Sequence, residues 1–299
     1  MYISSLVSAN PTPASDLASE PPAKPRPGMS TRHRVLFFIT GWLLVLMPFL
    51  FWWNTWFGRH LSEQQVTDYL QDDRHPRHIQ HALIQMGERM SRHDATVIRW
   101  YPELVRLAAH PVEEVRNTDA WVLGQDTSGS GFHDALVKML ADPSPVVRGN
   151  AALSLVRFGD ASGRLQIVAL LESVKITAPS AGRVVDADKP GTAIHQGGLI
   201  AKLQSDQRTV EVRSPISGRI RNLFVQTGRP VSVGTEIATV DPGTDQVWEA
   251  LRALYLIGQP GDLPAITPYE RHLPGVPDHI RQQALLTDKA IRDRAKGHS

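Results

Sequence analysis

The chain has 299 residues, a formal net charge of +2 and no cysteine. This length allows about two domains, and the lack of cysteine excludes disulfides, thiolate catalysis and thiolate metal sites. Basic residues are scattered without any run of five or more, so nucleic acid is not an expected partner.

The N-terminal region is expected to be a cytoplasmic tail followed by a transmembrane helix. Most of the segment 1–34 is rich in Pro, Ser and Ala, a composition that favours disorder. Residues 35–57 hold no charge and would rise about 34 Å as a helix, enough to cross a hydrocarbon core of about 30 Å. A cleaved signal peptide is disfavoured because the run is too long, starts late and lacks a small-residue cleavage site. Met29 is an alternative start to Met1.

Flanking charges predict the orientation of this span. Four basic residues precede it closely: Lys24, Arg26, Arg32 and Arg34. The positive-inside rule then places the N-terminus in the cytoplasm and residues 58–299 on the other side, which is the periplasm of a Gram-negative cell. We therefore expect a single-pass protein of the bacterial inner membrane that contacts the lipid bilayer through residues 35–57.

Similar helix-forming segments follow the span. "HPVEEVRNTDAWVLGQD" (110–126) and "DPSPVVRGNAALSLVRFGD" (142–160) share a Pro, a Val-Arg pair and an apolar stripe at an offset of 32 residues. Upstream, "YLQDDRHPRHIQHALIQMG" (69–87) has the same form. Pro111 and Pro143 are each expected to start a helix, where the missing N–H of proline costs nothing.

These segments resemble HEAT repeats of the short bacterial type. The resemblance implies a solenoid of paired antiparallel helices, in which an Arg and an Asp ladder between neighbouring repeats. It also implies structural roles for Arg116, Asp142 and Arg148.

The repeat pattern is interrupted once. "VDPGTDQVWEALRALYLIG" (240–258) aligns without a gap with residues 141–159, an offset of 99 where one repeat should advance by 32. The helix expected at 163–173 then has no partner until residue 245, so about 67 residues are inserted in the turn between two paired helices. The predicted parts are HEAT-like repeats at 58–173 and 241–299, and an inserted module at 174–240.

The insert is itself a duplication, beginning with "APSAGRVVDADKPG" at Ala178 and "SPISGRIRNLFVQTGRP" at Ser214. Short β-branched runs broken by Gly predict strands and turns. The glycines that recur between the halves should need positive φ or close backbone contact; they include Gly182, Gly191, Gly218 and Gly228.

This pattern resembles the biotinyl/lipoyl fold, the barrel-sandwich hybrid. In its carrier members, a modified Lys stands at the hairpin that joins the halves. "LQSDQRTVEV" matches the lipoyl form through Asp206 but has Gln207 at the acceptor position, and an amide offers no nucleophilic amine. Lys189 and Lys202 lie elsewhere in the insert. We therefore expect the scaffold without a cofactor.

The same fold without the Lys occurs in periplasmic adaptor (membrane fusion) proteins of efflux pumps and type I secretion systems. "VEVRSPISGRI" (210–220) resembles their second half-motif. Their α-helical hairpin between the halves and their following β-barrel domain have no counterpart here, which puts docking to an outer-membrane channel in doubt.

Other candidate chemistry is weak. His75, His78 and His81 bunch within "RHPRHIQH", but a metal site would need a third ligand and further support, so a solvated helix start is preferred. No metal is expected. Trp121 and Trp248 fall on predicted second helices and are assigned to packing, and Tyr255 is a candidate for a binding face.

The sequence thus predicts a mainly α protein with an inserted all-β domain and one N-terminal transmembrane helix. The expected function is that of a membrane-anchored periplasmic scaffold or adaptor, not an enzyme, which binds proteins through its HEAT solenoid and its non-lipoylated barrel-sandwich module. Inner-membrane and periplasmic proteins are its expected partners, within a transport or efflux complex. The alternative is a structural or assembly subunit of another membrane complex, such as a respiratory one.

Overall fold

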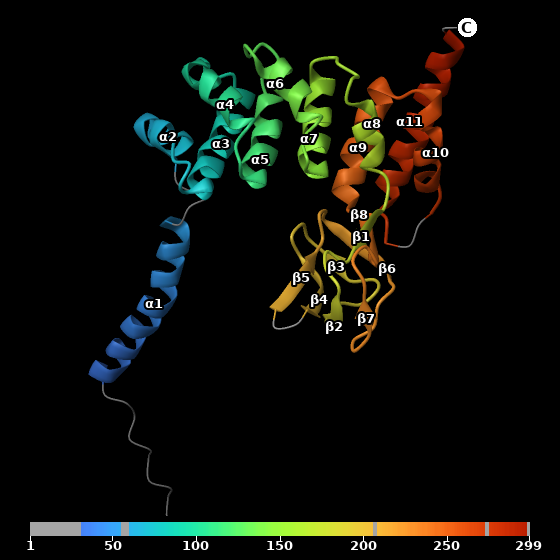
Figure 1. Cartoon of the computed structure of the whole chain (residues 1–299). Helices are drawn as coiled ribbons and strands as arrows, with labels where there is room; N and C mark the ends of the chain where they lie inside the picture. The colour runs from blue at the N-terminus through green and yellow to red at the C-terminus, as the bar shows by residue number, and fades with distance from the viewer. Residues whose placement is uncertain (1–30, 55–59, 206–207, 273–274, 298–299) are drawn as a thin grey trace, which may run out of the picture. The chain divides into compact units, whose positions relative to one another are not determined.

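The computed structural model describes residues 31–54, 60–205, 208–272 and 275–297. It divides into two compact units, Met1–Arg59 and His60–Ser299. The described part of the first unit is one helix, α1 (Thr31–Asn54) (Figure 1). Among the described residues, no helix combines the length and the apolarity that crossing a membrane requires. Residues 1–30 of the expected disordered tail and residues 55–57 of the expected span lie outside the described residues.

The second unit begins with helices that pack as pairs, each pair against the next (Figure 1). Before the insertion they are α2 (Glu63–Leu70), α3 (Pro76–Ser91), the 3-10 turn η1 (Ala95–Trp100), α4 (Tyr101–Leu107), α5 (Glu113–Leu123), α6 (Phe132–Met139), α7 (Pro145–Arg157) and α8 (Arg164–Ala169). The apolar stripes of the elements from α2 to α7 meet in one continuous core, in which Leu70, Met86, Leu123, Phe132 and Leu155 are fully buried. Such stacking buries a face that no single pair could bury alone.

The prolines of the repeats start fewer helices than expected. Pro76 is the first residue of α3 and Pro145 is the first residue of α7. Pro111 and Pro143, however, precede the N-cap residues of α5 and α7, so the expectation that they start helices was wrong. The residues that follow these prolines, Val112 and Ser144, have extended backbone with ψ of 123° and 124°, so each helix begins only after them.

The inserted module consists of two four-stranded antiparallel sheets. One sheet has the order β1-β8-β6-β3 and the other has the order β5-β4-β2-β7. The strands are β1 (Val174–Thr177), β2 (Gly182–Ala187), β3 (Ala193–Ile194), β4 (Leu199–Ser205), β5 (Arg208–Arg213), β6 (Gly218–Leu223), β7 (Pro230–Val231) and β8 (Glu236–Pro242). The duplication is visible in burial. The order of buried and exposed residues along β2 is the same as along β6, and the order along β4 is the same as along β8.

Helices resume directly after β8. They are α9 (Thr244–Ile257), the turn η2 (Pro260–Asp262), α10 (Leu263–Ile266), the turn η3 (Thr267–Glu270) and α11 (Asp278–Gly297). Helix α9 packs against α7, α8 and α11. Ile167 of α8 and Val247 and Leu251 of α9 are buried in one core, so the helices on either side of the insertion pack as a pair. The expected fold class, mainly α with an inserted all-β domain, is thereby confirmed.

Candidate functional site

An arginine links the second and third helix pairs. Arg116 of α5 donates from Nε and Nη2 to both carboxylate oxygens of Asp142, at 2.6 and 3.0 Å. Its Nη1 donates to the carbonyls of His110 and Pro111 in the preceding turn. Burial disfavours the charged carboxylate, but the hydrogen bonds from Arg116 and from the Ser144 amide outweigh it and hold the pKa of Asp142 below its ordinary value. Arg116 thus ties one turn to the next.

The same arrangement is half complete at the next repeat, where the insertion begins. Arg148 of α7 donates from Nη1 to the carbonyls of Asp142 and Pro143, at 2.6 and 3.0 Å. The acid that aligns with Asp142 in the following repeat is Asp241, at the end of β8. Its carboxylate instead accepts from Arg221 Nε at 2.6 Å and from Ser173 Oγ at 2.8 Å. The inserted module has therefore taken over the partner that a regular repeat would offer to Arg148.

The two ends of the insert leave and rejoin the helices side by side. Strands β1 and β8 pair, with Val174 opposite Val240. Just before β1, the carbonyl of Leu170 accepts from Gln246 Nε2 at 2.9 Å, and the carbonyl of Leu171 accepts from the Tyr269 hydroxyl at 2.7 Å. The connection before β1 is thus hydrogen-bonded to the later helices at two points, and the pairing of β1 with β8 joins the module to the helices through a two-stranded stalk.

The module also contacts the helices away from the stalk. Gln196, in the turn after β3, donates from Nε2 to Glu113 Oε1 of α5 at 3.0 Å. Val146 of α7 packs against the core of the β module. The module is therefore held at these two points against the helices that precede the insertion, in addition to its covalent connections.

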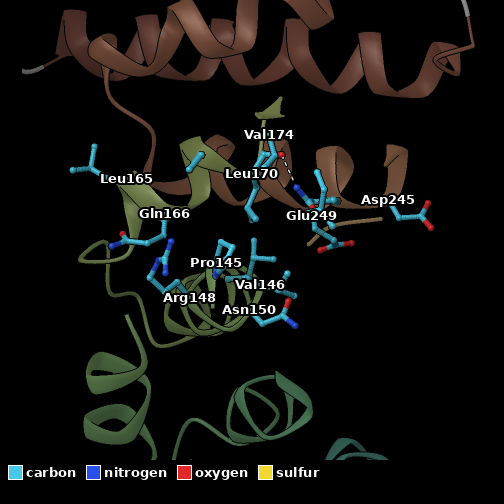
Figure 2. Close-up of a pocket in the computed structure, with 14 residues that line it drawn as sticks. Pro145, Val146, Arg148, Asn150, Leu165, Gln166, Leu170, Val174, Asp245 and Glu249 are labelled. Carbon is cyan, nitrogen blue, oxygen red and sulfur yellow. Dashed lines mark hydrogen bonds between the residues drawn. The ribbon is translucent and has the colours of Figure 1, made fainter. Parts of the chain in front are cut away.

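A cavity of about 430 Å³ lies where α7, α8 and α9 meet the module. Figure 2 shows the apolar side chains of Val146, Leu170 and Val174 lining its middle. Arg148 and Gln166 lie toward one end, and Asp245 toward the other. We call this the junction cavity; its remaining lining residues are Pro145, Asn150, Leu153, Leu165, Ala169, Ile216, Gln246 and Glu249.

The junction cavity has the character of a binding site. Arg148 offers a cation, Asp245 and Glu249 offer carboxylates, and the buried Oε1 of Gln166 has no hydrogen-bond partner among the described residues. Among the described residues, the lining includes no histidine, serine, threonine or lysine. An apolar middle with a few polar groups at its ends is typical of a recognition pocket.

A larger groove of about 920 Å³ runs over the second helices of successive pairs. We call it the solenoid groove. It is lined by residues of α5 and α7, which precede the insertion, and of α9 and α11, which follow it. Tyr255 and Leu256 of α9 lie in it with 43% and 61% of their surface exposed. Trp121 is 42% exposed, although its ring also lies against Gly87, where an added Cβ would come within 2.3 Å of it. The packing role expected for Trp121 is therefore incomplete, because the other part of the ring faces the groove.

Sequence reasoning expected the solenoid to bind protein and named Tyr255 for a binding face, but it did not identify the set of residues that form the groove. The signal was present in part, because the aromatic residues 121 and 255 both stood on second helices of the repeat pattern. Trp248 lies outside the groove lining, half-buried, with its ring edge-on to His279 at 5.0 Å between centroids.

The hairpin between the two halves of the module is short. Strand β4 ends at Ser205 and β5 begins at Arg208, and these two residues are paired. Asp206 and Gln207, the acceptor position, lie outside the described residues. Lys202 stands within β4 opposite Glu211 of β5, and Lys189 follows β2. Neither lysine is at the hairpin.

The recurring glycines lie at matching positions in the two halves. Gly191 and Gly228 both have φ of +87°. Arg183 donates to the carbonyl of Gly228 and Arg219 donates to the carbonyl of Gly191, so each half fastens a turn of the other. The sequence shows these arginines recurring, but their crossed pairing required the fold.

Gly182 and Gly218 stand where strands come close. A Cβ on Gly182 would lie 2.8 Å from the carbonyl oxygen of Gln204, and one on Gly218 would lie 1.8 Å from that of Asp241. Only glycine allows these approaches without moving a neighbouring strand.

The histidines of the first helix pair separate into two environments. His75 and His78 both direct Nδ1 at the carboxylate of Asp72, whereas His81 is buried and its Nε2 lies 2.9 Å from Gln85 Nε2. Asp72 was missed as a member of this cluster, although its spacing of three residues from His75 could have revealed it.

Two family models match parts of the chain. The biotin/lipoyl family, described as "Biotin-requiring enzyme", matches residues 174–240, and the HEAT repeat matches residues 134–162. The "Putative efflux system component YhbJ" of Bacillus subtilis (strain 168) is 43% identical over 68 residues, which cover 22% of this chain and 30% of that protein. The chain thus spans less than a third of the curated relative that it matches.

Among solved structures, similarity was found to one titled "Structure and function of a single-chain, multi-domain long-chain acyl-coa carboxylase". The identity is 17% and the TM-score 0.23, over 32% of this chain and 10% of the other. A likeness of this size carries no argument. The family matches and the two sheets agree with each other, and the chain combines HEAT repeats with an inserted biotinyl/lipoyl-like module.

Proposed function

We propose that this chain is a membrane-anchored scaffold that holds protein partners within a transport or efflux complex. The observation that carries the proposal is the fastening of a carrier-type module to a helical solenoid, with Gln207 in place of the acceptor lysine. A swinging carrier needs mobility and a nucleophilic amine, whereas a docked module without that amine serves as a fixed surface. The name of the partly matched relative supports the transport setting.

We also propose that residues 35–57 anchor the chain in a bacterial inner membrane with residues 58–299 in the periplasm. Sequence supports this, because the run is uncharged and is preceded by basic residues. Helix α1 covers most of the run, and its apolar side chains are exposed where they are described, for example Phe37 at 71% and Trp42 at 68%. An apolar helix surface of this kind is stable only against lipid or protein.

Partners would bind mainly in the solenoid groove. Stacked repeats form extended surfaces that bind other chains without any catalytic centre. Here Tyr255 and Leu256 provide the exposed apolar anchors, and Arg157 and Arg252 provide charges beside them. Exposed aromatic and apolar side chains in a hollow, with arginines nearby, are typical of the residues that dominate binding energy at interfaces.

The second candidate function is that of a structural or assembly subunit of another membrane complex such as a respiratory one. The short β4–β5 connection favours it, because adaptors of efflux pumps carry a helical hairpin at this point and this chain has only residues 206 and 207 between the strands. Without the hairpin, the solenoid groove is the main surface for binding.

Affinity capture of the full-length chain in mild detergent tests both functions. Recovery of an inner-membrane transporter supports the first, and recovery of oxidoreductase subunits supports the second. Leu256→Glu, in the groove, should abolish recovery of the partner. Ile98→Glu is the matched control, because Ile98 is exposed to a similar extent, 58%, but lies on η1 outside the groove. Equal recovery by both variants would overturn the groove as the binding surface.

A further inference from the structure

We infer that Asp72, His75 and His78 form a binding site for one divalent transition-metal ion of the zinc type. The site lies at the turn between α2 and α3, in the first helix pair. It is separate from the junction cavity and from the solenoid groove, and it does not depend on the function proposed above.

The backbone sets these three residues at regular spacing. The amide of His75 donates to the carbonyl of Asp72 at 2.9 Å, and the amide of His78 donates to the carbonyl of His75 at 2.8 Å. Pro76 is the first residue of α3, and its ring fixes φ where the chain enters the helix. Residues three apart in such a turn lie on one side of the chain. The three side chains are therefore brought together by local structure alone.

The side chains converge on a single carboxylate oxygen. Asp72 Oδ2 lies 2.8 Å from Nδ1 of His75 and 2.6 Å from Nδ1 of His78. A neutral imidazole can present a lone pair from Nδ1, and a carboxylate presents several. Zinc binds such atoms at about 2.0–2.2 Å. Small rotations of the three side chains, which shift each ligand atom by only a fraction of an ångström, would therefore make room for an ion between them. The ion would take the place of the protons that now join the rings to the carboxylate.

The surroundings of the three side chains favour metal binding. The ring of His78 stacks on Tyr69 of α2 with 4.3 Å between centroids and 9° between planes, which fixes its orientation. The side chain of His75 is 63% exposed, so an ion can enter from solvent and a water can complete its coordination.

The donor set specifies the class of ion. Two imidazole nitrogens and one carboxylate oxygen suit zinc and its neighbours in the transition series. Calcium and magnesium prefer sites made of oxygen ligands. The ligand atoms of Asp72, His75 and His78 all lie within 4.8 Å of one another, close enough to bind one ion together, and this is the group among the described residues that does so.

Isothermal titration of the tag-free full-length chain in detergent, with ZnCl₂ and separately with MgCl₂, tests the site. The expected result is one zinc ion per chain and no saturable magnesium binding. His75→Ala is the main variant, because this side chain is exposed and makes no capping hydrogen bond. It should weaken zinc binding at least about tenfold, the loss that even an outer partner of a metal ligand typically causes. Asp72→Asn should do the same.

His133→Ala is the matched control. His133 also faces a carboxylate, with Nε2 at 2.8 Å from Asp160 Oδ2, but the group lacks a second histidine ligand among the described residues. This variant should bind zinc as the unchanged chain does. A second readout is the visible spectrum of the Co²⁺ complex, which should be lost in His75→Ala while circular dichroism shows the helices intact. Absence of zinc binding in the unchanged chain, or unchanged binding in His75→Ala, would overturn the site.

Discussion

Replacing Arg116 by methionine should show how far the link between turns stabilises the solenoid. Arg116 and Asp142 are largely buried, with side chains 12% and 7% exposed, and they form two parallel hydrogen bonds. Removing one partner of a buried pair costs about 3–5 kcal/mol, since the other charge is left buried and unpaired. Arg148→Met is the matched comparison: Arg148 makes the same two carbonyl contacts, but no paired carboxylate of the next repeat is described for it. Each carbonyl contact of the charged group contributes about 1.5–3 kcal/mol, but Arg116→Met loses two such contacts as well, so this cost is common to both variants.

Hydrogen–deuterium exchange on peptides covering α5 and α7 measures these local costs without requiring the whole chain to unfold in one step. Because only Arg116→Met leaves the Asp142 carboxylate without its arginine, it should exchange faster than Arg148→Met by at least a factor of ten, which corresponds to about 1.4 kcal/mol. Adding Asp142→Asn to Arg116→Met should restore part of the protection, because the unpaired charge is removed. Equal exchange in the two single variants would refute the reasoning.

Three further predictions concern the core, the module and its hairpin. Burial raises the pKa of Asp119 well above its ordinary value, and neither carboxylate oxygen has a hydrogen-bond partner among the described residues. A raised folded pKa means that stability falls as pH rises above the ordinary value of a carboxyl group. In thermal melts, Asp119→Asn should therefore stabilise the chain by an amount that grows as pH rises above that ordinary value; a constant difference would contradict this. Gly218→Ala should destabilise the module by about 3 kcal/mol or more in urea titrations, because the new Cβ would lie 1.8 Å from the Asp241 carbonyl oxygen. Gly261→Ala is the control and should behave as the unchanged chain, because a Cβ there would have nothing within 4 Å. Gln207→Lys should gain a lipoyl adduct with a lipoate ligase while the unchanged chain gains none, as read by intact mass; no adduct on the lysine variant would show that the hairpin is not a carrier tip.

The fold class could be predicted because its signals are local and repeated. The offset between residues 142–160 and 110–126 indicated stacked helix pairs, and the offset at 240–258 indicated an interruption. Helix α8 then packs with α9 as that interruption implies. What failed was the start of two helices, since Pro111 and Pro143 resemble helix-starting prolines in sequence. In both turns the proline carbonyl accepts from an arginine side chain five residues later, a contact that the helix propensities of the single residues do not show.

The binding surfaces were less predictable than the elements. The solenoid groove combines residues of four helices, and the junction cavity combines residues on both sides of the insertion. Periodicity assigned Trp121 to packing, because a sequence shows which helix face a residue is on but not that only part of a large ring is covered. Asp72 was overlooked because the search began from histidines alone.

Photo-crosslinking in cells tests the central claim most directly. A crosslinking amino acid placed at Tyr255, in the solenoid groove, should capture a membrane transport protein, and one placed at the similarly exposed Ile98 should capture none. Capture of no protein from position 255, or of the same proteins from both positions, would contradict the account of this chain as a scaffold that binds through its helical groove.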